Sequence, residues 1–147
     1  MVNDIAPDAT AVADELRPVL MRLSRGLRRE ARALGITAGQ VTLLFLIKGS
    51  PGLGVRELAL RERISPPAMS GHVRRLERAG LVERTPHPSD RRRHGLTVSA
   101  QGERLLRSVK SLRTAWLAER LRELEPDELA AVERAIAPLA RLLEGAR

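Results

Sequence analysis

Arginine side chains are concentrated in the middle of this chain. Nine arginines and only four acidic residues lie between Arg61 and Arg93, which gives this segment a net charge of +5. The segment from Glu119 to Arg134 has the opposite balance, with six acids and three arginines. Guanidinium groups bind phosphate oxygens and the acceptor atoms of guanine. The middle of the chain is therefore predicted to contact a polyanion such as a nucleic acid.

The residues that other kinds of chemistry need are missing or scattered. The chain of 147 residues has no cysteine, which excludes disulfides, thiolate zinc sites and thiol-based sensing. The three histidines, His72, His87 and His94, lack the spacing of metal ligands, so we expect no metal and no cofactor. There are no paired carboxylates, no nucleophile elbow and no complete phosphate-binding loop. We expect no catalytic residues and no enzymatic activity.

Two short helices joined by a tight turn are expected to position the arginines. The first runs from about Val55 to Arg61. The second has Ser65 as its N-cap and Pro66 at its first position, and Gly80 suits a left-handed C-cap. Apolar residues at spacings of four and three would face inward from this helix, namely Met69, Val73 and Leu76.

The opposite face of the second helix has the composition of a surface that reads DNA. It is small at Ser70 and Gly71, which permits close approach, and it is cationic toward its C-terminal end. The candidate DNA contacts on this helix are Ser65, Pro67, Ser70, Gly71, Arg74, Arg75 and Arg78. A surface helix with solvated arginines is the alternative, and the basic segment that follows argues against it.

A β-hairpin with a basic tip is predicted after this helix. Leu81–Thr85 and His94–Val98 read as strands, and residues 86–93 form a turn-rich connection. Helix, tight turn, polar-faced helix and hairpin make up a winged helix-turn-helix. Its second helix fits the major groove of DNA, and its hairpin can lie along the neighbouring minor groove. The predicted fold class is mainly α with a small β-hairpin wing.

Helices are also predicted before this unit. An apolar stripe over residues 12–34 indicates a long first helix that ends at Gly35. Pro18 should kink that helix or mark where its regular part begins. The run from Val41 to Ile47 is apolar nearly all round, so its helix is expected to be covered on most sides.

Two more amphipathic helices are predicted over residues 99–124 and 127–143. Their apolar stripes are more than a lobe of about 60 residues can cover, because each stripe needs a packing partner. We therefore expect the protein to be a dimer in solution.

The sequence resembles the multiple-antibiotic-resistance regulator (MarR) family from about Leu16 to Leu143. The resemblance is carried by Glu57-Leu-Ala59, by Ser65 through Val82 and Arg84, and above all by Pro88-Ser-Asp-Arg-Arg92 followed by Val98-Ser-Ala-Gln-Gly102. It implies one MarR-type domain over residues 1–147, in which residues 37–98 form the DNA-binding lobe. Residues 1–35 and 99–147 would then be the helices that hold an obligate dimer.

For the wing, the resemblance implies that Asp90 orients Arg92 and that Arg92 enters the minor groove. The residue chemistry agrees, because a narrow and negative minor groove attracts an arginine at a hairpin tip. Arg91 and Arg93 would then be phosphate contacts. The alternative is that this tip is a merely solvated turn.

Three positions depart from the family pattern. Arg63 stands where the turn of such units often has glycine, so it must adopt a left-handed conformation or reshape the turn. Pro66 and Pro67 stiffen the start of the second helix. Pro138 lies within the last helix and could bend the dimerisation region. The first two put the DNA sequence preference in doubt.

The resemblance also implies a small lipophilic or aromatic effector, bound in a cleft between the dimer helices and the DNA-binding lobe. The residues that could border this cleft are Leu23, Leu27, Phe45 and Trp116. The alternative is that these four residues are core or dimer contacts.

Together these features predict a homodimeric transcription regulator that binds a pseudo-palindromic operator in double-stranded DNA and most often represses until a ligand releases it. An architectural winged-helix protein with little sequence preference and no effector is one alternative. A winged helix used only for protein–protein contact is another, and the arginines argue against it. No export signal opens the chain, and no apolar run approaches the roughly 20 residues of a membrane span. We therefore expect a cytoplasmic protein without membrane contact.

Overall fold

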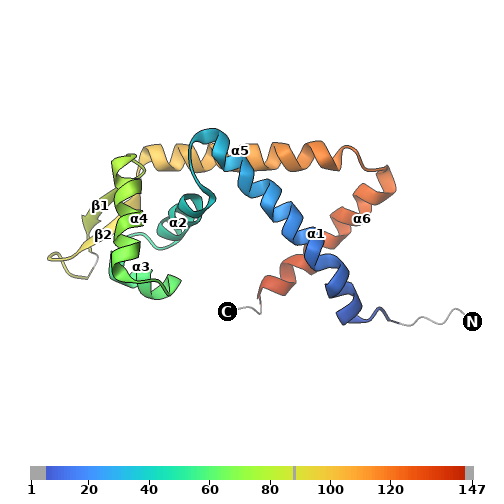
Figure 1. Ribbon diagram of the computed structural model, residues 1–147, viewed down its shortest axis with the longest axis horizontal. Helices are drawn as coiled ribbons and strands as arrows, with labels where there is room; N and C mark the ends of the chain where they lie inside the picture. Colours follow the sequence, from blue (N-terminus) through green and yellow to red (C-terminus); the bar gives the residue numbers. More distant parts are fainter. Residues whose placement is uncertain (1–5, 88, 145–147) are drawn as a thin grey trace, which may run out of the picture.

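The computed structural model describes residues 6–87 and 89–144; Pro88 of the hairpin motif lies outside them. The molecule is elongated, with a small lobe at one end and long helices extending away from it (Figure 1). In chain order the elements are α1 (Ala9–Glu30), the 3₁₀ helix η1 (Ala31–Leu34), α2 (Ala38–Gly49), α3 (Val55–Glu62), α4 (Pro66–Arg78), β1 (Val82–Pro86), β2 (His94–Val98), α5 (Ala100–Leu121) and α6 (Pro126–Glu144). This is the mainly helical winged helix-turn-helix that the sequence predicts.

Local capping groups set the helix boundaries of the lobe. The hydroxyl of Ser65 accepts a hydrogen bond from the backbone N–H of Ala68 at 3.3 Å. Ser65 is therefore the N-cap of α4, as the sequence predicts. Gly80 has a φ of +73° and turns the chain from α4 toward the hairpin. Arg63 caps α3 in the left-handed region, at a φ of 54°. The turn thus keeps its usual shape, and a residue with a Cβ bears a strain of roughly 1 kcal/mol.

The hairpin is an antiparallel pair, from Val82 opposite Val98 to Pro86 opposite His94, and β1 begins and ends one residue later than the predicted strand Leu81–Thr85. The loop after α2 packs against this hairpin. The backbone N–H of Gly52 donates a hydrogen bond to the carbonyl of Leu96 at 2.9 Å, and Gly95 lies against the backbone of Gly52. A Cβ on Gly95 would lie 2.0 Å from the carbonyl oxygen of Gly52. Both glycines therefore serve the contact that seats the wing on the lobe.

The hydrophobic core lies within the lobe and at its junction with α5. Its largest fully buried side chains come from α2, α3, α4 and β2, among them Leu44, Ile47, Leu58, Met69, Leu76 and Leu96. Leu106 and Val109 of α5 are also buried in this cluster. The start of α5 therefore belongs to the core of the lobe, and the rest of the helix projects from a fixed base.

The helix α1 packs against α5 through a close contact. Trp116 lies so near Gly26 that a Cβ there would come within 2.1 Å of the indole ring. The guanidinium of Arg113 donates to the carbonyl of Leu27 at 3.1 Å, and Arg120 stacks over Trp116 at 3.7 Å from the ring centre. Gly26 is thus the position that lets the two helices approach.

The structure adds detail to three expectations for the helices. The α-helix α1 ends at Glu30, and a 3₁₀ turn fills the interval before Gly35, which caps it at a φ of 72°. Helix α1 begins at Ala9, so Pro18 lies well inside it and does not mark its start. Phe45 of α2 is 45% exposed, because the protomer leaves one side of this helix uncovered.

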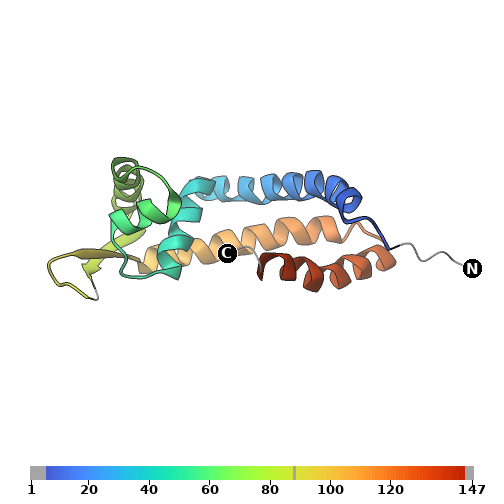
Figure 2. The same ribbon diagram turned by 90° about the horizontal axis from the view of Figure 1, so that it is seen from below.

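The outer helices expose much of their apolar surface. None of the residues of α6 is buried, and Gly26 is the buried residue of α1. Figure 2 shows α1 and α6 standing apart, with α5 at a level between them. The large exposed apolar residues on these two helices include Val12, Val19, Leu20, Met21, Leu129, Val132, Ile136, Leu142 and Leu143. Their faces lack the covering layer that the lobe has.

The length and apolar composition of the helices bear on whether any of them could cross a membrane. In the described part of the chain, no single helix is both long and apolar enough to cross a membrane. The segments Ala9–Leu34 and Ala38–Gly49 have the required length and apolar composition only when they are taken together, and they meet at a bend of 90°.

Candidate nucleic-acid interface

The helix α4 presents the predicted polar face to solvent. Met69, Val73 and Leu76 are buried against the lobe, which fixes the rotation of the helix about its axis. The opposite side consists of exposed Pro67, Arg74, Arg75 and Arg78 with half-buried Ser70 and Gly71 between them. A Cβ on Gly71 would meet nothing nearer than the end of Arg75, at 4.0 Å. The middle of this face is therefore open to close approach by a partner.

The tip of the wing is shaped by Asp90. Its carboxylate accepts a hydrogen bond from the backbone N–H of Arg92 at 2.9 Å, and its carbonyl accepts one from Arg93 at 3.0 Å. These bonds fold the tip into a turn, and the side chains of Arg91 and Arg92 are exposed on it. In this protomer Asp90 thus positions Arg92 through its backbone.

The base of the wing is held by Glu57, a residue whose role the sequence did not reveal. One carboxylate oxygen of Glu57 lies 3.3 Å from Nε2 of His87 and 3.4 Å from a guanidinium nitrogen of Arg93. The side chain of His87 is only 12% exposed, and its Nδ1 accepts from the backbone N–H of Ser89 at 3.2 Å. The carboxylate of α3 therefore ties both ends of the tip to the helix-turn-helix.

This ion pair changes the interpretation of Arg93. We expected Arg93 to contact phosphate, but the structure directs its guanidinium to Glu57, 36 residues earlier in the chain. A contact at that separation leaves no local pattern in the sequence. A second ion pair, Arg84 to Glu77 at 2.6 Å, joins the hairpin to the end of α4. The wing is thus linked to α3 and to α4 by two separate charge contacts.

We predict that Glu57→Gln lowers the affinity for DNA about threefold, because an exposed ion pair contributes roughly 0–1 kcal/mol and its loss frees the wing base. Thermal stability should change little. Titration of a labelled duplex with both proteins measures the effect.

The matched control is Glu83→Gln, which removes the same charge from an exposed position on β1. Removing an acid near DNA by itself favours binding. Glu57→Gln should therefore bind more weakly than Glu83→Gln, and equal affinities would show that Glu57 does not position the wing.

Two of the four candidate effector residues lie at the same helix contact, and the other two are exposed. Leu27 and Trp116 are half-buried where α1 meets α5. Leu23, on α1, and Phe45, on α2, are exposed. Within residues 6–87 and 89–144, no group of three or more histidine, aspartate or glutamate side chains is arranged to hold a metal ion.

Comparison with known proteins identifies the fold and its function. The model of the MarR family matches residues 36–94, which span the helix-turn-helix and the hairpin up to the start of β2. The HTH-type transcriptional regulator MT0903.1 of Mycobacterium tuberculosis is 35% identical over 117 residues, covering 80% of this chain and 82% of that protein. The HTH-type transcriptional repressor MdtR of Bacillus subtilis is 26% identical over 144 residues, covering 98% and 88%.

A solved structure agrees over nearly the whole length. A putative transcriptional regulator from Pseudomonas aeruginosa superposes with a TM-score of 0.78 at 31% identity, covering 93% of this chain and 98% of that one. The names of the family and of these relatives are those of transcription regulators and not of enzymes. Regulators of the family bind DNA as dimers. This chain therefore belongs to the MarR family and is a DNA-binding transcription regulator.

Proposed function

We propose that the protein acts in the cytoplasm as a homodimeric repressor that binds a pseudo-palindromic operator and is released by a small-molecule effector. The observation that carries this proposal is the pairing of an open, arginine-rich face on α4 with a wing tip that Asp90 folds and Glu57 anchors. Both features lie at the same end of the molecule (Figure 1). The uncovered apolar faces lie on the helices that extend away from it.

The α4 face is suited to the major groove. Ser70 and Gly71 would let the helix approach the base edges, and Arg74 offers a guanidinium that can bind O6 and N7 of guanine. The helix contacts that we propose are Ser65, Pro67, Ser70, Gly71, Arg74, Arg75 and Arg78, with Asp90, Arg91 and Arg92 on the wing. Arg93 would act mainly through its ion pair with Glu57.

The homodimer is proposed from the apolar faces of α1 and α6. Val132 and Ile136 lie on one side of α6. None of the residues of α6 is buried, so this side is not covered by the rest of the chain. A second copy would cover these faces with the same residues, because two-fold interfaces are self-complementary. The dimer would carry two copies of α4 at its two ends.

Repression is proposed because MdtR, which matches nearly the whole chain, is named a repressor. Release by an effector rests on the family resemblance, with Leu23, Leu27, Phe45 and Trp116 as the proposed border of a cleft near the dimer helices. Leu27 and Trp116 do lie at one helix contact, which supports that part of the border.

The function is tested with the DNA upstream of the protein's own gene. A footprint there should show two half-sites about one helical turn apart, roughly 34–36 Å, because a two-fold dimer presents its recognition helices symmetrically. Affinity for that duplex should exceed affinity for random duplex by a factor of about 10³ or more.

Equal affinity for both duplexes would favour the architectural alternative, which needs no sequence preference. A footprint without dyad symmetry would contradict the proposed dimer. Neither outcome requires a known effector, so the regulator and the effector are tested separately.

A further inference from the structure

The helix α4 begins with two prolines, Pro66 and Pro67, which leave its first turn without free backbone donors. Neither proline has an N–H. The N–H of Ala68 donates to the hydroxyl of Ser65 at 3.3 Å, and the N–H of Met69 donates to the carbonyl of Ser65 at 3.0 Å. Helix starts with free N–H groups bind phosphate. The start of α4 therefore cannot bind phosphate in this way.

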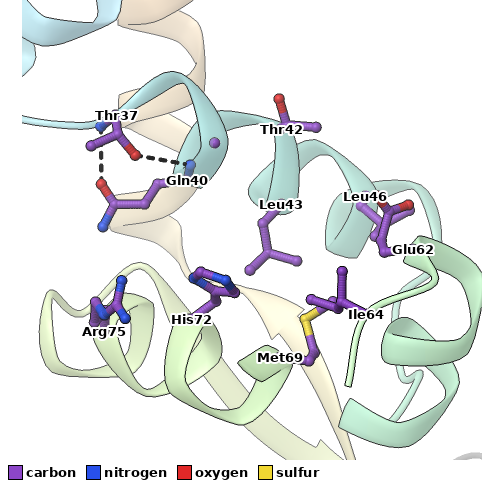
Figure 3. Close-up of a pocket in the computed structure, with 11 residues that line it drawn as sticks. Thr37, Gln40, Thr42, Leu43, Leu46, Glu62, Ile64, Met69, His72 and Arg75 are labelled. Carbon is purple, nitrogen blue, oxygen red and sulfur yellow. Dashed lines mark hydrogen bonds between the residues drawn. The ribbon is translucent and has the colours of Figure 1, made fainter. Parts of the chain in front are cut away.

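Pro67 faces away from the lobe. Figure 3 shows Met69, His72 and Arg75 on the wall of a cavity between α2 and α4. Successive residues of an α-helix are about 100° apart, so Pro67 lies about 160° round the helix from buried Met69. By the same geometry, Pro66 lies about 100° to one side of Pro67. The exposed ring of Pro67 is therefore the apolar group at the centre of the open face, and Pro66 is on its flank.

Pro67 is the first of a row of residues along the open face of α4. Ser70 and Gly71 follow about one turn later, Arg74 about two turns later and Arg78 about three turns later. The face therefore changes along its length, from apolar at the helix start, through small residues, to cationic toward the helix end. The N-terminal residues of a recognition helix are the ones that contact base edges in the major groove. The apolar end of the face is thus placed to meet a base.

One of the four bases offers an apolar group in the major groove. Thymine carries its C5 methyl there, whereas the other three bases present hydrogen-bond donors and acceptors alone. A proline ring can cover the methyl, but it has no group that could pair with those donors and acceptors. Leaving such a polar group buried and unpaired costs its full desolvation free energy. Contact with Pro67 therefore favours thymine and disfavours the other three bases.

We propose that Pro67 reads the C5 methyl of one thymine in each half-site of the operator. This inference rests on the proposed function, because it assigns a base to a residue of the proposed DNA face. Arg74 is seven residues after Pro67, which is about 10.5 Å along the helix axis, and base pairs are about 3.4 Å apart. The thymine therefore lies about three base pairs from the base that Arg74 contacts.

Deoxyuridine tests the methyl group alone, because it differs from thymidine only at C5. The duplex is the operator from the upstream footprint or, if that region has none, one selected from a pool of random duplexes. Each thymine of the half-sites is replaced in turn, in both half-sites at once. At one position the affinity should fall about fourfold per half-site, about 16-fold in all, which corresponds to burial of one methyl group at each. Thymines outside the half-sites control for any effect of deoxyuridine on the duplex itself.

Methylated cytosine gives a second readout at the same position. A duplex with cytosine in place of that thymine should bind more weakly than the operator. 5-Methylcytosine should recover about fourfold per half-site, because its methyl occupies the same place in the major groove. Equal affinities for the cytosine and 5-methylcytosine duplexes would contradict the contact.

Two neighbouring variants assign the contact to one residue. Pro67→Gly removes the ring at the centre of the open face, and Pro66→Gly is the matched control on its flank. The loss of affinity from thymine to uracil should vanish in Pro67→Gly and persist in Pro66→Gly. If the loss persists in both variants, another residue reads the methyl and the assignment to Pro67 is wrong. If Pro67→Gly does not fold, Pro67→Ser and Pro66→Ser give the same comparison, because serine is well tolerated at a helix start.

The reading of thymine can fail while the proposed function holds, and the titrations separate the two results. A protein that binds every duplex equally, random sequence included, reads no base, which overturns the proposed function and this inference together. A protein that prefers its operator but binds the thymine and uracil duplexes equally keeps the proposed function. That second result overturns the contact between Pro67 and thymine alone.

Discussion

Replacing Ile136 with aspartate is expected to convert the dimer into monomers and to lower operator affinity more than about 100-fold. Ile136 is 63% exposed on α6, within the apolar face that we assign to the second copy. A carboxylate in that interface would lose its water without gaining a partner, which costs several kcal/mol in typical cases. A monomer would then hold one half-site instead of two, so its affinity would lose the contribution of the second α4. Light scattering should return about 16.2 kDa for the variant and twice that mass for the wild type.

The matched control is Ala131→Asp, which adds the same charge at an exposed position on another side of α6. It should stay dimeric and bind the operator normally. The lobe has its own core, so the Ile136 variant should keep the circular dichroism of a folded helical protein. A variant that remains a dimer, or a wild type near 16.2 kDa at every concentration, would contradict the proposed interface.

The parts of the fold that sequence predicts well are those decided by neighbouring residues. Ser65 and Ser99 act as N-caps by accepting N–H groups three residues later, and such spacing is visible in the chain itself. Gly80 and Arg63 stand where a helix must end before the next element begins. The hairpin followed equally from two short strand patterns around a turn-rich segment. Each of these features depends on a few residues that lie close together in the sequence.

The parts that sequence could not supply depend on contacts between distant segments. The carboxylate of Glu57 meets Arg93 only because α3 and the wing pack together, and nothing near either residue encodes this pairing. The cavity beside Arg75 likewise arises from the distance between α2 and α4. Arg75 was predicted for its charge, but its position on both the DNA face and a cavity wall needed the folded lobe.

Apolar patterning also cannot tell which molecule covers a face. The run around Phe45 predicted a helix covered on most sides, and four of its residues are buried, but the pattern does not show that the side carrying Phe45 is exposed in the protomer. The stripe on α6 was predicted in the same way, and it has no buried residue at all. A period of 3.6 residues identifies an apolar side of a helix, whereas the identity of its partner depends on tertiary or quaternary packing.

Replacing Arg92 with alanine is expected to lower operator affinity at least about tenfold, which corresponds to about 1.4 kcal/mol. The side chain is exposed at the wing tip, and alanine keeps the backbone N–H that Asp90 accepts. Dimer mass and melting temperature should therefore stay nearly unchanged. If Arg92 enters the minor groove, the loss should be larger when the DNA beneath the wing is A·T-rich, because that groove is narrower and more negative. Titration of two operators that differ only under the wing measures this dependence.

The neighbouring Arg91→Ala is the control, since it removes the same charge from the same exposed tip. As a phosphate contact, Arg91 should lower affinity equally on both operators and reduce the salt slope by about 0.9. Asp90→Ala should resemble Arg92→Ala more weakly, because it removes the acceptor that folds the tip but leaves the guanidinium in place. If Arg92→Ala also affects both operators equally, with the same change in salt slope, Arg92 contacts phosphate and not the minor groove. If it changes neither affinity, the wing does not touch DNA, and the assignment of residues 90–92 is wrong.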